Sequence, residues 1–220
     1  MKIVAISGVH GTGKTTLINE LHKMYHSIVI DESATHFLQT KFPFQDVDND
    51  IDVFKEFQRA LLADQIKKLK SFFFDDDKIL FVDRTPIDSL GYVFERLSKE
   101  RSFDFEYYKK YREDVYEIME KFHWNKIYFT KFDFLDRSFD WVWKRKDFGD
   151  RNPSPFYLEN LNAIILQEYM RFRELYTGTI EHFFTIHFSA VEDRKVYIAS
   201  TIDEYFGKEG RNFRRGNDEH

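Results

Sequence analysis

The segment Gly8-Val9-His10-Gly11-Thr12-Gly13-Lys14-Thr15 decides how the start of this chain folds. It matches the pattern G-x-x-x-x-G-K-[ST], in which a glycine-rich loop leads into a helix. The preceding residues 2–7 are mostly apolar and β-branched, which predicts a buried strand. The following residues 15–25 carry apolar side chains at helical spacing. This order of strand, loop and helix predicts a binding site for the phosphates of a nucleoside triphosphate.

The residue types within the loop fit that chemistry. Glycines let successive backbone N–H groups turn inward around phosphate oxygens, and the N-terminus of the helix adds partial positive charge. We expect Lys14 to reach the β- and γ-phosphates and the Thr15 hydroxyl to hold Mg²⁺. The residues expected to bind the nucleotide are Gly8, His10, Gly11, Thr12, Gly13, Lys14, Thr15 and Thr16. The alternative is a glycine-rich turn that matches by chance, and the flanking strand and helix count against it.

Composition narrows the class of protein. The chain has 220 residues, which suits one domain with a full core and a small inserted lid. It has no cysteine and no apolar run of membrane-spanning length. Because the first residues already predict a strand and the glycine-rich loop, we expect no signal peptide. We therefore expect a cytoplasmic protein without membrane contact. The net charge of −5 argues against binding to extended nucleic acid.

Strands alternate with helices along the chain. Further strands are expected at the apolar runs 27–31, 78–83, 126–130 and 182–188. Helices are expected over 33–40, 51–74, from Thr85-Pro86 onward, 104–122, 154–176 and 191–206. This alternation predicts a three-layer α/β/α domain built on a five-stranded parallel sheet, and the loop 8–15 indicates the P-loop NTPase type. We expect the domain to span residues 1–206, with a lid at about 134–155, and residues 207–220 to form a disordered tail.

Acidic residues follow two of the expected strands, at the edge where parallel sheets bind their ligands. Asp83 closes a wholly apolar strand, so we expect it to hold the magnesium shell together with Thr15. Arg84 follows directly, and its guanidinium could clamp phosphate oxygens or the reacting hydroxyl. Glu32 ends the second strand, where a carboxylate can take a proton from an attacking hydroxyl. Asp31 is the alternative for this role.

Four positions are candidates for contact with a second substrate. Gln58, on the long helix, offers a donor and an acceptor side by side, which matches the edge of a nucleobase. Its neighbour Phe57 could line the same pocket or belong to the core, and the helix face around Tyr92 would shape the pocket further. Asp88 lies three residues after Thr85, a spacing that fits either a capping box or a substrate contact from the first helical turn.

The stretch 134–155 is charged, aromatic and poorly periodic, which is typical of a mobile lid. It carries Arg145, Lys146 and Arg151. We expect Arg145 and Arg151 to arrive over the γ-phosphate when the lid closes, because phosphoryl transfer spreads negative charge over its oxygens. A solvated basic loop is the alternative.

Several different short motifs follow one another along the chain. They are the phosphate loop 8–15, Asp31-Glu32-Ser33-Ala34, Phe57-Gln58, Asp83-Arg84 with Tyr92 downstream, the lid with spaced arginines, and Glu192-Asp193-Arg194 at the start of the last helix. Over roughly residues 1–206 the chain thereby resembles the P-loop kinases of nucleosides and nucleotides. The resemblance is to the deoxynucleoside kinase and thymidylate kinase group, and to the NadR-type AAA-domain group that includes bacterial nicotinamide riboside kinase.

The resemblance implies transfer of phosphate from ATP, with Mg²⁺, to a small nucleoside or nucleoside monophosphate. It implies that Glu32 is the base toward the acceptor hydroxyl, that Gln58 reads the nucleobase, and that Asp83 and Arg84 contact magnesium and the reacting centre. Deoxynucleoside kinases usually have Glu-Pro and Glu-Arg-Ser where this chain has Glu32-Ser33 and Asp83-Arg84-Thr85. Thymidylate kinases usually have Tyr after Asp-Arg. The identity of the acceptor is therefore left open.

Other classes of protein are alternatives. Thr130-Lys131-Phe132-Asp133 copies a guanine-reading tetrapeptide, as in a GTP-binding switch. Such a switch needs Asp-x-x-Gly after the third strand to sense the γ-phosphate, and this chain has Asp83-Arg84-Thr85-Pro86 there. A bare ATPase, or a kinase of a nucleotide at a DNA end, is a further alternative. Aromatic residues over 103–122 suit a homodimer interface and the core equally well.

Overall fold

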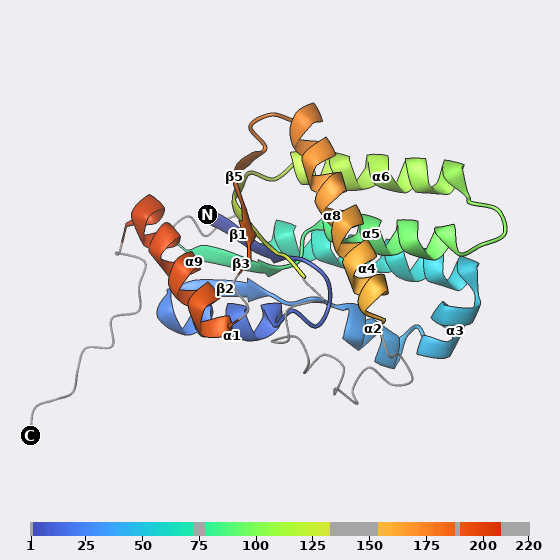
Figure 1. Ribbon diagram of the computed structural model, residues 1–220, viewed down its shortest axis with the longest axis horizontal. Helices are drawn as coiled ribbons and strands as arrows, with labels where there is room; N and C mark the ends of the chain where they lie inside the picture. The colour runs from blue at the N-terminus through green and yellow to red at the C-terminus, as the bar shows by residue number, and fades with distance from the viewer. Residues whose placement is uncertain (1, 73–77, 133–153, 188–189, 208–220) are drawn as a thin grey trace, which may run out of the picture.

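The computed structural model describes residues 2–72, 78–132, 154–187 and 190–207, and it centres on one parallel β-sheet (Figure 1). The strands of this sheet lie in the order β2-β3-β1-β4-β5. Their bounds are β1 Lys2–Ser7, β2 Ser27–Ile30, β3 Ile79–Asp83, β4 Trp124–Thr130 and β5 Ile180–Ile186. The predicted five-stranded parallel sheet is thus confirmed.

The central strands β1 and β3 determine where the polar residues at the sheet edge lie. Every residue of β3 is buried, and so is every residue of β1 after Lys2, as the continuous apolar runs predict for strands covered on both faces. The parallel register pairs Ile6 with Asp83. Asp83 therefore ends its strand beside the point where β1 gives way to the glycine-rich loop.

Helices cover both faces of the sheet (Figure 1). One face packs against α1 (Lys14–Met24) and α9 (Val191–Phe206), in a core that includes Val4 and Ile6 of β1. The helices on the side of the other face are α4 Ile51–Ser71, α5 Pro86–Ser98, α6 Phe105–Glu120 and α8 Pro155–Leu175. The arrangement is the expected three-layer α/β/α domain.

The segment between β2 and α4 differs from the expectation. We expected a loop around Pro43, but α3 (Phe44–Asn49) follows this proline directly, after α2 (Ala34–Thr40). Pro43 is the N-cap residue of α3. A helix of six residues has fewer than two turns, which is too short for hydrophobic periodicity to reveal. Strands β4 and β5 also begin two residues earlier than expected, at Trp124 and Ile180.

Helix α5 begins as the sequence indicates and packs closely on α8. Thr85 is its N-cap residue, Pro86 follows at the first helical position, and Asp88 completes a capping box. One turn further, a Cβ atom added to Gly91 would lie 2.4 Å from Cγ1 of Ile165 in α8. The absence of a side chain at Gly91 therefore permits the two helices to approach each other at this level.

A buried carboxylate fastens α6 to α8. Glu168 accepts hydrogen bonds from the hydroxyls of Tyr108 at 3.2 Å and Tyr116 at 2.6 Å, and Arg171 pairs with it at 2.7 Å. Tyr111 of α6 is also buried. The aromatic residues of α6 therefore belong largely to the core, and they give no separate support to a homodimer.

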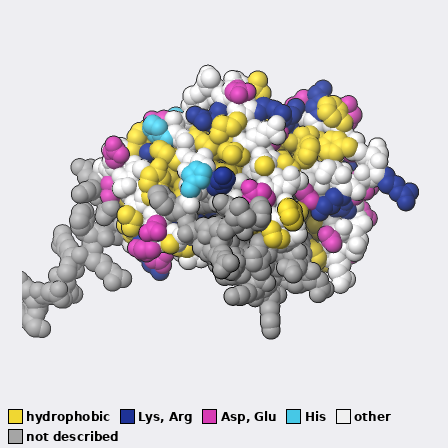
Figure 2. Space-filling view, viewed as in Figure 1, with side chains coloured by type: hydrophobic (Ala, Val, Ile, Leu, Met, Phe, Trp, Pro, Cys, Tyr) yellow, Lys and Arg dark blue, Asp and Glu magenta, His cyan; other side chains and the backbone are white. Residues whose placement is uncertain are grey.

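The surface carries charges of both signs. Figure 2 shows basic, acidic and apolar side chains interspersed over the visible face, in keeping with the small net negative charge of the sequence. Within the described residues, no helix combines the length and the apolar character needed to cross a lipid bilayer.

The packing of α5 on α8 gives a first prediction. We expect G91A to lower the free energy of unfolding by about 1–3 kcal/mol, because the added Cβ collides with Ile165. Helix propensity alone would change stability in the opposite sense, by about 1 kcal/mol. Urea denaturation measures the difference, and N19A, at an exposed position of α1, is the control with an expected change below about 0.5 kcal/mol. A G91A protein as stable as the wild type would contradict the close approach of the helices.

Candidate active site

The glycine-rich loop connects β1 to α1 and has the shape that its sequence predicts. Gly8, Gly11 and Gly13 have φ angles of 128°, 83° and 76°, in the region that favours glycine. A Cβ atom at Gly8 would also lie 2.4 Å from Oγ1 of Thr130. Gly13 is the N-cap residue of α1, and Thr16 is exposed on the first turn. The loop and the helix N-terminus thus form the kind of cradle that binds anions.

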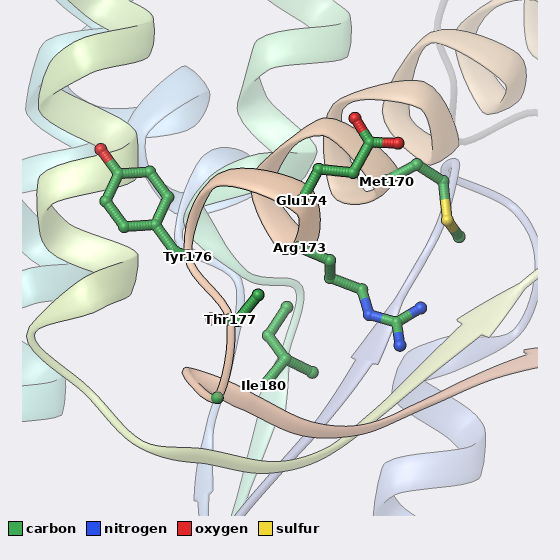
Figure 3. A pocket seen from close by; sticks show the side chains of 7 residues that line it. Met170, Arg173, Glu174, Tyr176, Thr177 and Ile180 are labelled. Carbon is green, nitrogen blue, oxygen red and sulfur yellow. The ribbon is translucent and has the colours of Figure 1, made fainter.

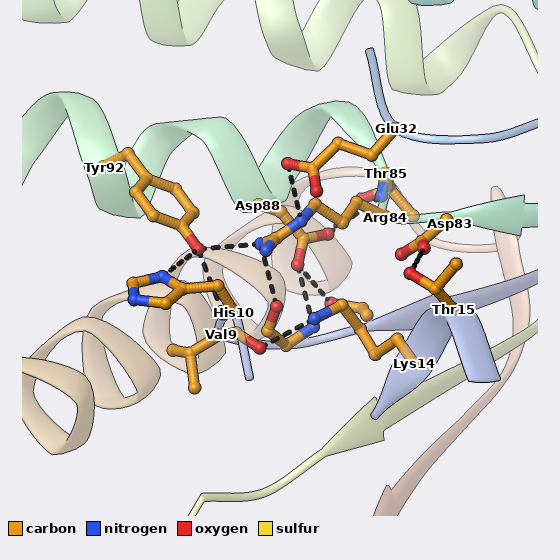
Figure 4. A network of polar contacts seen from close by, with 12 residues as sticks. Val9, His10, Lys14, Thr15, Glu32, Asp83, Arg84, Thr85, Asp88 and Tyr92 are labelled. Atoms are coloured by element: carbon orange, nitrogen blue, oxygen red, sulfur yellow. Dashed lines mark hydrogen bonds and ion pairs between the residues drawn. The ribbon is translucent and has the colours of Figure 1, made fainter. Parts of the chain in front are cut away.

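A buried carboxylate holds the start of this loop (Figure 4). Asp88 is 1% exposed, and its Oδ1 accepts hydrogen bonds of 2.8 Å from the Gly8 amide and the Ser7 hydroxyl. Its Oδ2 accepts from the Thr85 amide at 2.8 Å and from the Tyr169 hydroxyl at 3.0 Å. Both oxygens are therefore used inside the protein. This geometry favours the capping box over the substrate contact that we considered for Asp88.

Lys14 lies under the loop with its ammonium group withdrawn from solvent. Its Nζ donates to the Val9 carbonyl at 2.7 Å and lies 3.5 Å from the Thr12 hydroxyl oxygen. Burial lowers the pKa of Lys14 to about 8; the positive charge of Arg84 acts in the same direction, and Asp83 opposes it. A desolvated ammonium that binds a neutral carbonyl gains stability when an anion takes that place.

Asp83 and Thr15 meet where β3 ends and α1 begins. The Thr15 hydroxyl donates to Oδ2 of Asp83 at 2.6 Å, whereas Oδ1 is buried without a hydrogen-bond partner among the described residues. Burial raises the pKa of Asp83, and the nearby charge of Glu32 adds to this. Hydroxyl and carboxylate oxygens are the ligands that Mg²⁺ prefers. The unpartnered Oδ1 therefore fits a shell of magnesium and its waters.

Arg84 links the loop to Glu32 (Figure 4). Its Nη1 donates to the Gly8 carbonyl and to the Tyr92 hydroxyl, both at 2.9 Å. Its Nε lies 2.9 Å from Oε1 of Glu32, an ion pair in which the N–H group does not point at the carboxylate. The side chain of Arg84 is buried, whereas that of Glu32 is 38% exposed. Glu32 can therefore keep this pair and still face a molecule outside.

The two acids after β2 have different surroundings. Asp31 is exposed, and its backbone carbonyl accepts a hydrogen bond from Lys68 at 3.3 Å. Glu32 is turned toward Arg84, and its charge acts on both Lys14 and Asp83. The geometry favours Glu32 over Asp31 for a role at this site.

Tyr92 holds α5 against the loop. Its hydroxyl oxygen accepts a hydrogen bond of 3.2 Å from the His10 amide and lies 3.1 Å from Nδ1 of the same histidine. Burial raises the pKa of Tyr92 to about 12. Because the hydroxyl is used by the loop and by Arg84, the ring is the part of Tyr92 left for a second substrate.

Both candidates on α4 are buried. Phe57 packs edge-on against Phe42, with ring centroids 5.7 Å apart, which favours the core over the pocket for this residue. Gln58 is 5% exposed, and the Tyr111 hydroxyl donates to its backbone carbonyl at 3.3 Å. Gln65, two turns further along, donates to the Arg84 carbonyl at 3.0 Å and so fixes the backbone there.

Two contacts of the loop were not foreseen. The Thr130 hydroxyl donates to the Ser7 carbonyl at 2.7 Å and lies 3.1 Å from that of Thr12, although the sequence suggested only a guanine-reading role for it. Arg194 of α9 donates to the Thr12 carbonyl. Both residues are more than 100 positions away from their partners, so no local spacing signals these contacts. Each residue lies at the end of an expected strand or the start of an expected helix, and Arg194 also belongs to the motif Glu192-Asp193-Arg194, but neither signal identifies the loop as the partner.

Part of the expected site lies outside the described residues. This holds for Arg145, Lys146 and Arg151, for Asp133 of the guanine-reading tetrapeptide, and for the tail beyond Gly207. Of the expected lid, only residues 154–155 are described, and Pro155 begins α8.

A shallow hollow lies elsewhere on the molecule (Figure 3). It is lined by Met170, Arg173, Glu174, Tyr176, Thr177, Gly178 and Ile180, at the end of α8 and the start of β5. Because all strands are parallel, the start of β5 lies at the edge of the sheet opposite to the glycine-rich loop. The hollow is therefore separate from the candidate site.

Solved structures of kinases share this fold. A deoxyadenosine kinase from M. mycoides, with dCMP and a flexible dCDP bound, aligns with a TM-score of 0.65 at 18% identity, over 92% of this chain and 99% of that one. A thymidylate kinase from Candida albicans aligns with a TM-score of 0.56 at 15% identity, over 94% and 93%. The NadR protein in complex with NR aligns with a TM-score of 0.65 at 16% identity, over 94% of this chain and 51% of that one.

Comparison of the sequence with known proteins and family profiles identifies the family of this chain. Among curated proteins, none matches this sequence. The profile of the AAA domain family matches residues 3–154, a span that runs from β1 to the start of α8 and holds the loop, Glu32, Asp83 and Arg84. The chain therefore belongs to the AAA domain family, and its fold is that of the P-loop kinases of nucleosides and nucleotides.

Proposed function

We propose that this protein is a phosphotransferase that moves the γ-phosphate of Mg²⁺-ATP to a small nucleoside or nucleoside monophosphate acceptor. The observation that carries the proposal is the convergence of Lys14, Asp83 and the Arg84–Glu32 pair at the rim of the sheet where β1 meets the loop. A cation for phosphate, an acid for metal and a second acid for an alcohol are the groups that such a transfer needs.

The phosphate side of the site rests on the loop. In this proposal the amides of residues 8–16 and the Lys14 ammonium bind the triphosphate, and the Thr15 hydroxyl and Asp83 hold magnesium. When bound, magnesium neutralises charge on the β- and γ-phosphate oxygens. The contact between Lys14 and the Val9 carbonyl is then exchanged for contacts with phosphate, whose negative charge raises the pKa of the lysine.

The acceptor side rests on Glu32. In the proposed step its carboxylate takes the proton of the acceptor hydroxyl, and the hydroxyl oxygen forms a bond to the γ-phosphorus. The bond between this phosphorus and the β–γ bridging oxygen breaks, and ADP leaves with that oxygen. Arg84 holds Glu32 in place through the 2.9 Å ion pair and stabilises the developing negative charge.

Recognition of the acceptor involves the helices above this rim. Gln58 offers its amide to the edge of a nucleobase, and Tyr92 offers its ring. Arg145 and Arg151 complete the site by closing over the γ-phosphate. We further propose that the enzyme acts in the cytoplasm, with a homodimer as one form to be tested.

A GTP-binding switch is the competing function. Two observations, the contacts of Thr130 and the capping box of α5, argue against it. The Thr130 side chain, first in the guanine-reading tetrapeptide, is 1% exposed and is used by the Ser7 carbonyl and by Thr12. At the position where a switch needs flexible glycine-containing backbone, Thr85 and Asp88 form the capping box of α5. A comparison of ATP and GTP affinities separates the two functions.

A screen of acceptors tests the proposed function directly. Purified protein with Mg²⁺-ATP is offered nucleosides, nucleoside monophosphates, nicotinamide riboside and a DNA end, and acceptor-dependent release of ADP is measured. We expect release with one of the small acceptors. If ADP release is the same with and without every acceptor, the protein is an ATPase without an acceptor, and the proposal is overturned.

We expect K14A to reduce acceptor-dependent ADP release by at least about a hundredfold, because the ammonium that stabilises the transferred charge is lost. The fold should persist, since among the described residues the Lys14 side chain binds only groups of its own loop. Initial rates and thermal unfolding check both statements. K23A removes an exposed lysine of the same helix and should keep full activity. Undiminished turnover in K14A would refute the assignment.

We expect E32Q to lower kcat by about 10²- to 10⁴-fold, because an amide cannot take the proton of the acceptor hydroxyl. The affinity for ATP should change little, since Glu32 lies on the acceptor side of Arg84. Steady-state kinetics together with calorimetric titration of ATP separate the two effects. D31N alters the neighbouring exposed acid and should leave kcat near the wild-type value. The base role is wrong if E32Q weakens only ATP binding, or if D31N causes the larger loss.

A further inference from the structure

The first turn of α9 packs against the glycine-rich loop. Arg194, on this turn, is 2% exposed, although arginine is among the residues that are rarely buried. Its Nη1 donates to the Thr12 carbonyl, and its Nε donates to the Ala190 carbonyl at 3.4 Å. A Cβ atom at Gly13 would lie 3.5 Å from both Nη2 of Arg194 and Cγ2 of Val191, an ordinary van der Waals distance, so the loop and the start of α9 lie directly against each other. Figure 1 shows α9 beside α1, the helix that the loop enters.

The bond to Thr12 orients one amide of the loop. The carbonyl of Thr12 and the N–H group of Gly13 belong to the same peptide unit, in which they point in opposite directions. Because the carbonyl is held toward α9, the Gly13 N–H points away from α9. The cradle function of such a loop depends on amides that point together toward the phosphates before the nucleotide arrives.

A buried guanidinium costs more than an apolar side chain, and the bond to the loop offsets part of this cost. Burial lowers the pKa of Arg194, which means that the surroundings disfavour its charge. An apolar side chain could fill the same space between α9 and the loop without that cost. The directed bond to the Thr12 carbonyl is what an apolar side chain could not supply.

We propose that Arg194 is a positioning residue for the phosphate site: by holding the Thr12 carbonyl from behind, it fixes the Gly13 amide in the orientation that binds a nucleoside triphosphate. The proposal rests on the nucleotide-binding half of the proposed function and is independent of the acceptor. It makes the start of α9 part of the nucleotide site, although the helix follows the loop by more than 170 residues.

The test compares variants of Arg194 in the binding of a non-hydrolysable ATP analogue with Mg²⁺ and without acceptor, by isothermal titration calorimetry. We expect R194Q to weaken binding about tenfold, the loss of one charge-assisted hydrogen bond. R194K should weaken it about threefold, because an ammonium can still reach one carbonyl. In steady-state kinetics the KM for ATP should rise in the same order, while the KM for the acceptor and kcat stay within about twofold.

Lys195 provides the matched control. It is the next residue of α9, and it pairs with the exposed Glu192 at 2.6 Å. K195Q removes the same charge from the same helix turn and should bind the analogue like the wild type. A merely structural role for Arg194 would lower the thermal stability of R194Q without this selective loss of nucleotide affinity.

A folded R194Q that binds the analogue within twofold of the wild type overturns the proposal, and so does an equal loss in K195Q. If R194Q does not fold, R194K decides, with affinity within twofold of the wild-type value as the contrary result. A wild-type protein that binds the analogue but transfers no phosphate would refute the kinase proposal alone. Failure of the two proposals is thereby distinguished.

Discussion

The glycine-rich loop depends on a carboxylate that lies buried behind it. Asp88 accepts the Gly8 N–H and the Ser7 hydroxyl on one oxygen, and the Thr85 amide and the Tyr169 hydroxyl on the other. A buried carboxylate is tolerated only when hydrogen bonds replace its water, so all these donors have to be present together. They come from the end of β1, the start of α5 and the middle of α8. The shape of the loop is therefore a property of the assembled fold, and not of the glycines alone.

The polar groups around the loop are of two kinds. Asp88, Thr130 and Tyr92 have their hydrogen-bonding groups satisfied within the protein and act as rigid supports. Asp83 keeps one oxygen without a partner among the described residues, and the Lys14 ammonium is bound to a neutral carbonyl. Incompletely satisfied buried groups are stabilised by a ligand that supplies the missing partner. One free acceptor and one weakly paired cation, close together, match a metal ion and a phosphate.

Much of this arrangement could be predicted from local sequence, because strand patterns and the pattern of the glycine-rich loop extend over few residues. The parallel register then brings strand ends together, which is why Asp83 and Glu32 could be expected at one rim. The loop contacts of Asp88 and Arg194 join residues 80 and 182 positions apart. Such contacts arise from the packing of whole helices, which no spacing encodes. Helix α3 was missed for the opposite reason, since it is too short to show a period.

Arg84 connects the phosphate side and the acceptor side of the proposed reaction. Its backbone is strained in the conformation that makes this connection. Its φ angle of 72° lies in the left-handed region, which costs a residue with a side chain roughly 1–2 kcal/mol. The Ile6 carbonyl accepts its amide, and Gln65 donates to its carbonyl, so neighbouring elements hold the strained conformation. A relaxed φ would turn the side chain to another direction. The strain therefore keeps one guanidinium in contact with Gly8 of the glycine-rich loop and with Glu32, so that the proposed base and the proposed phosphate site share a single support.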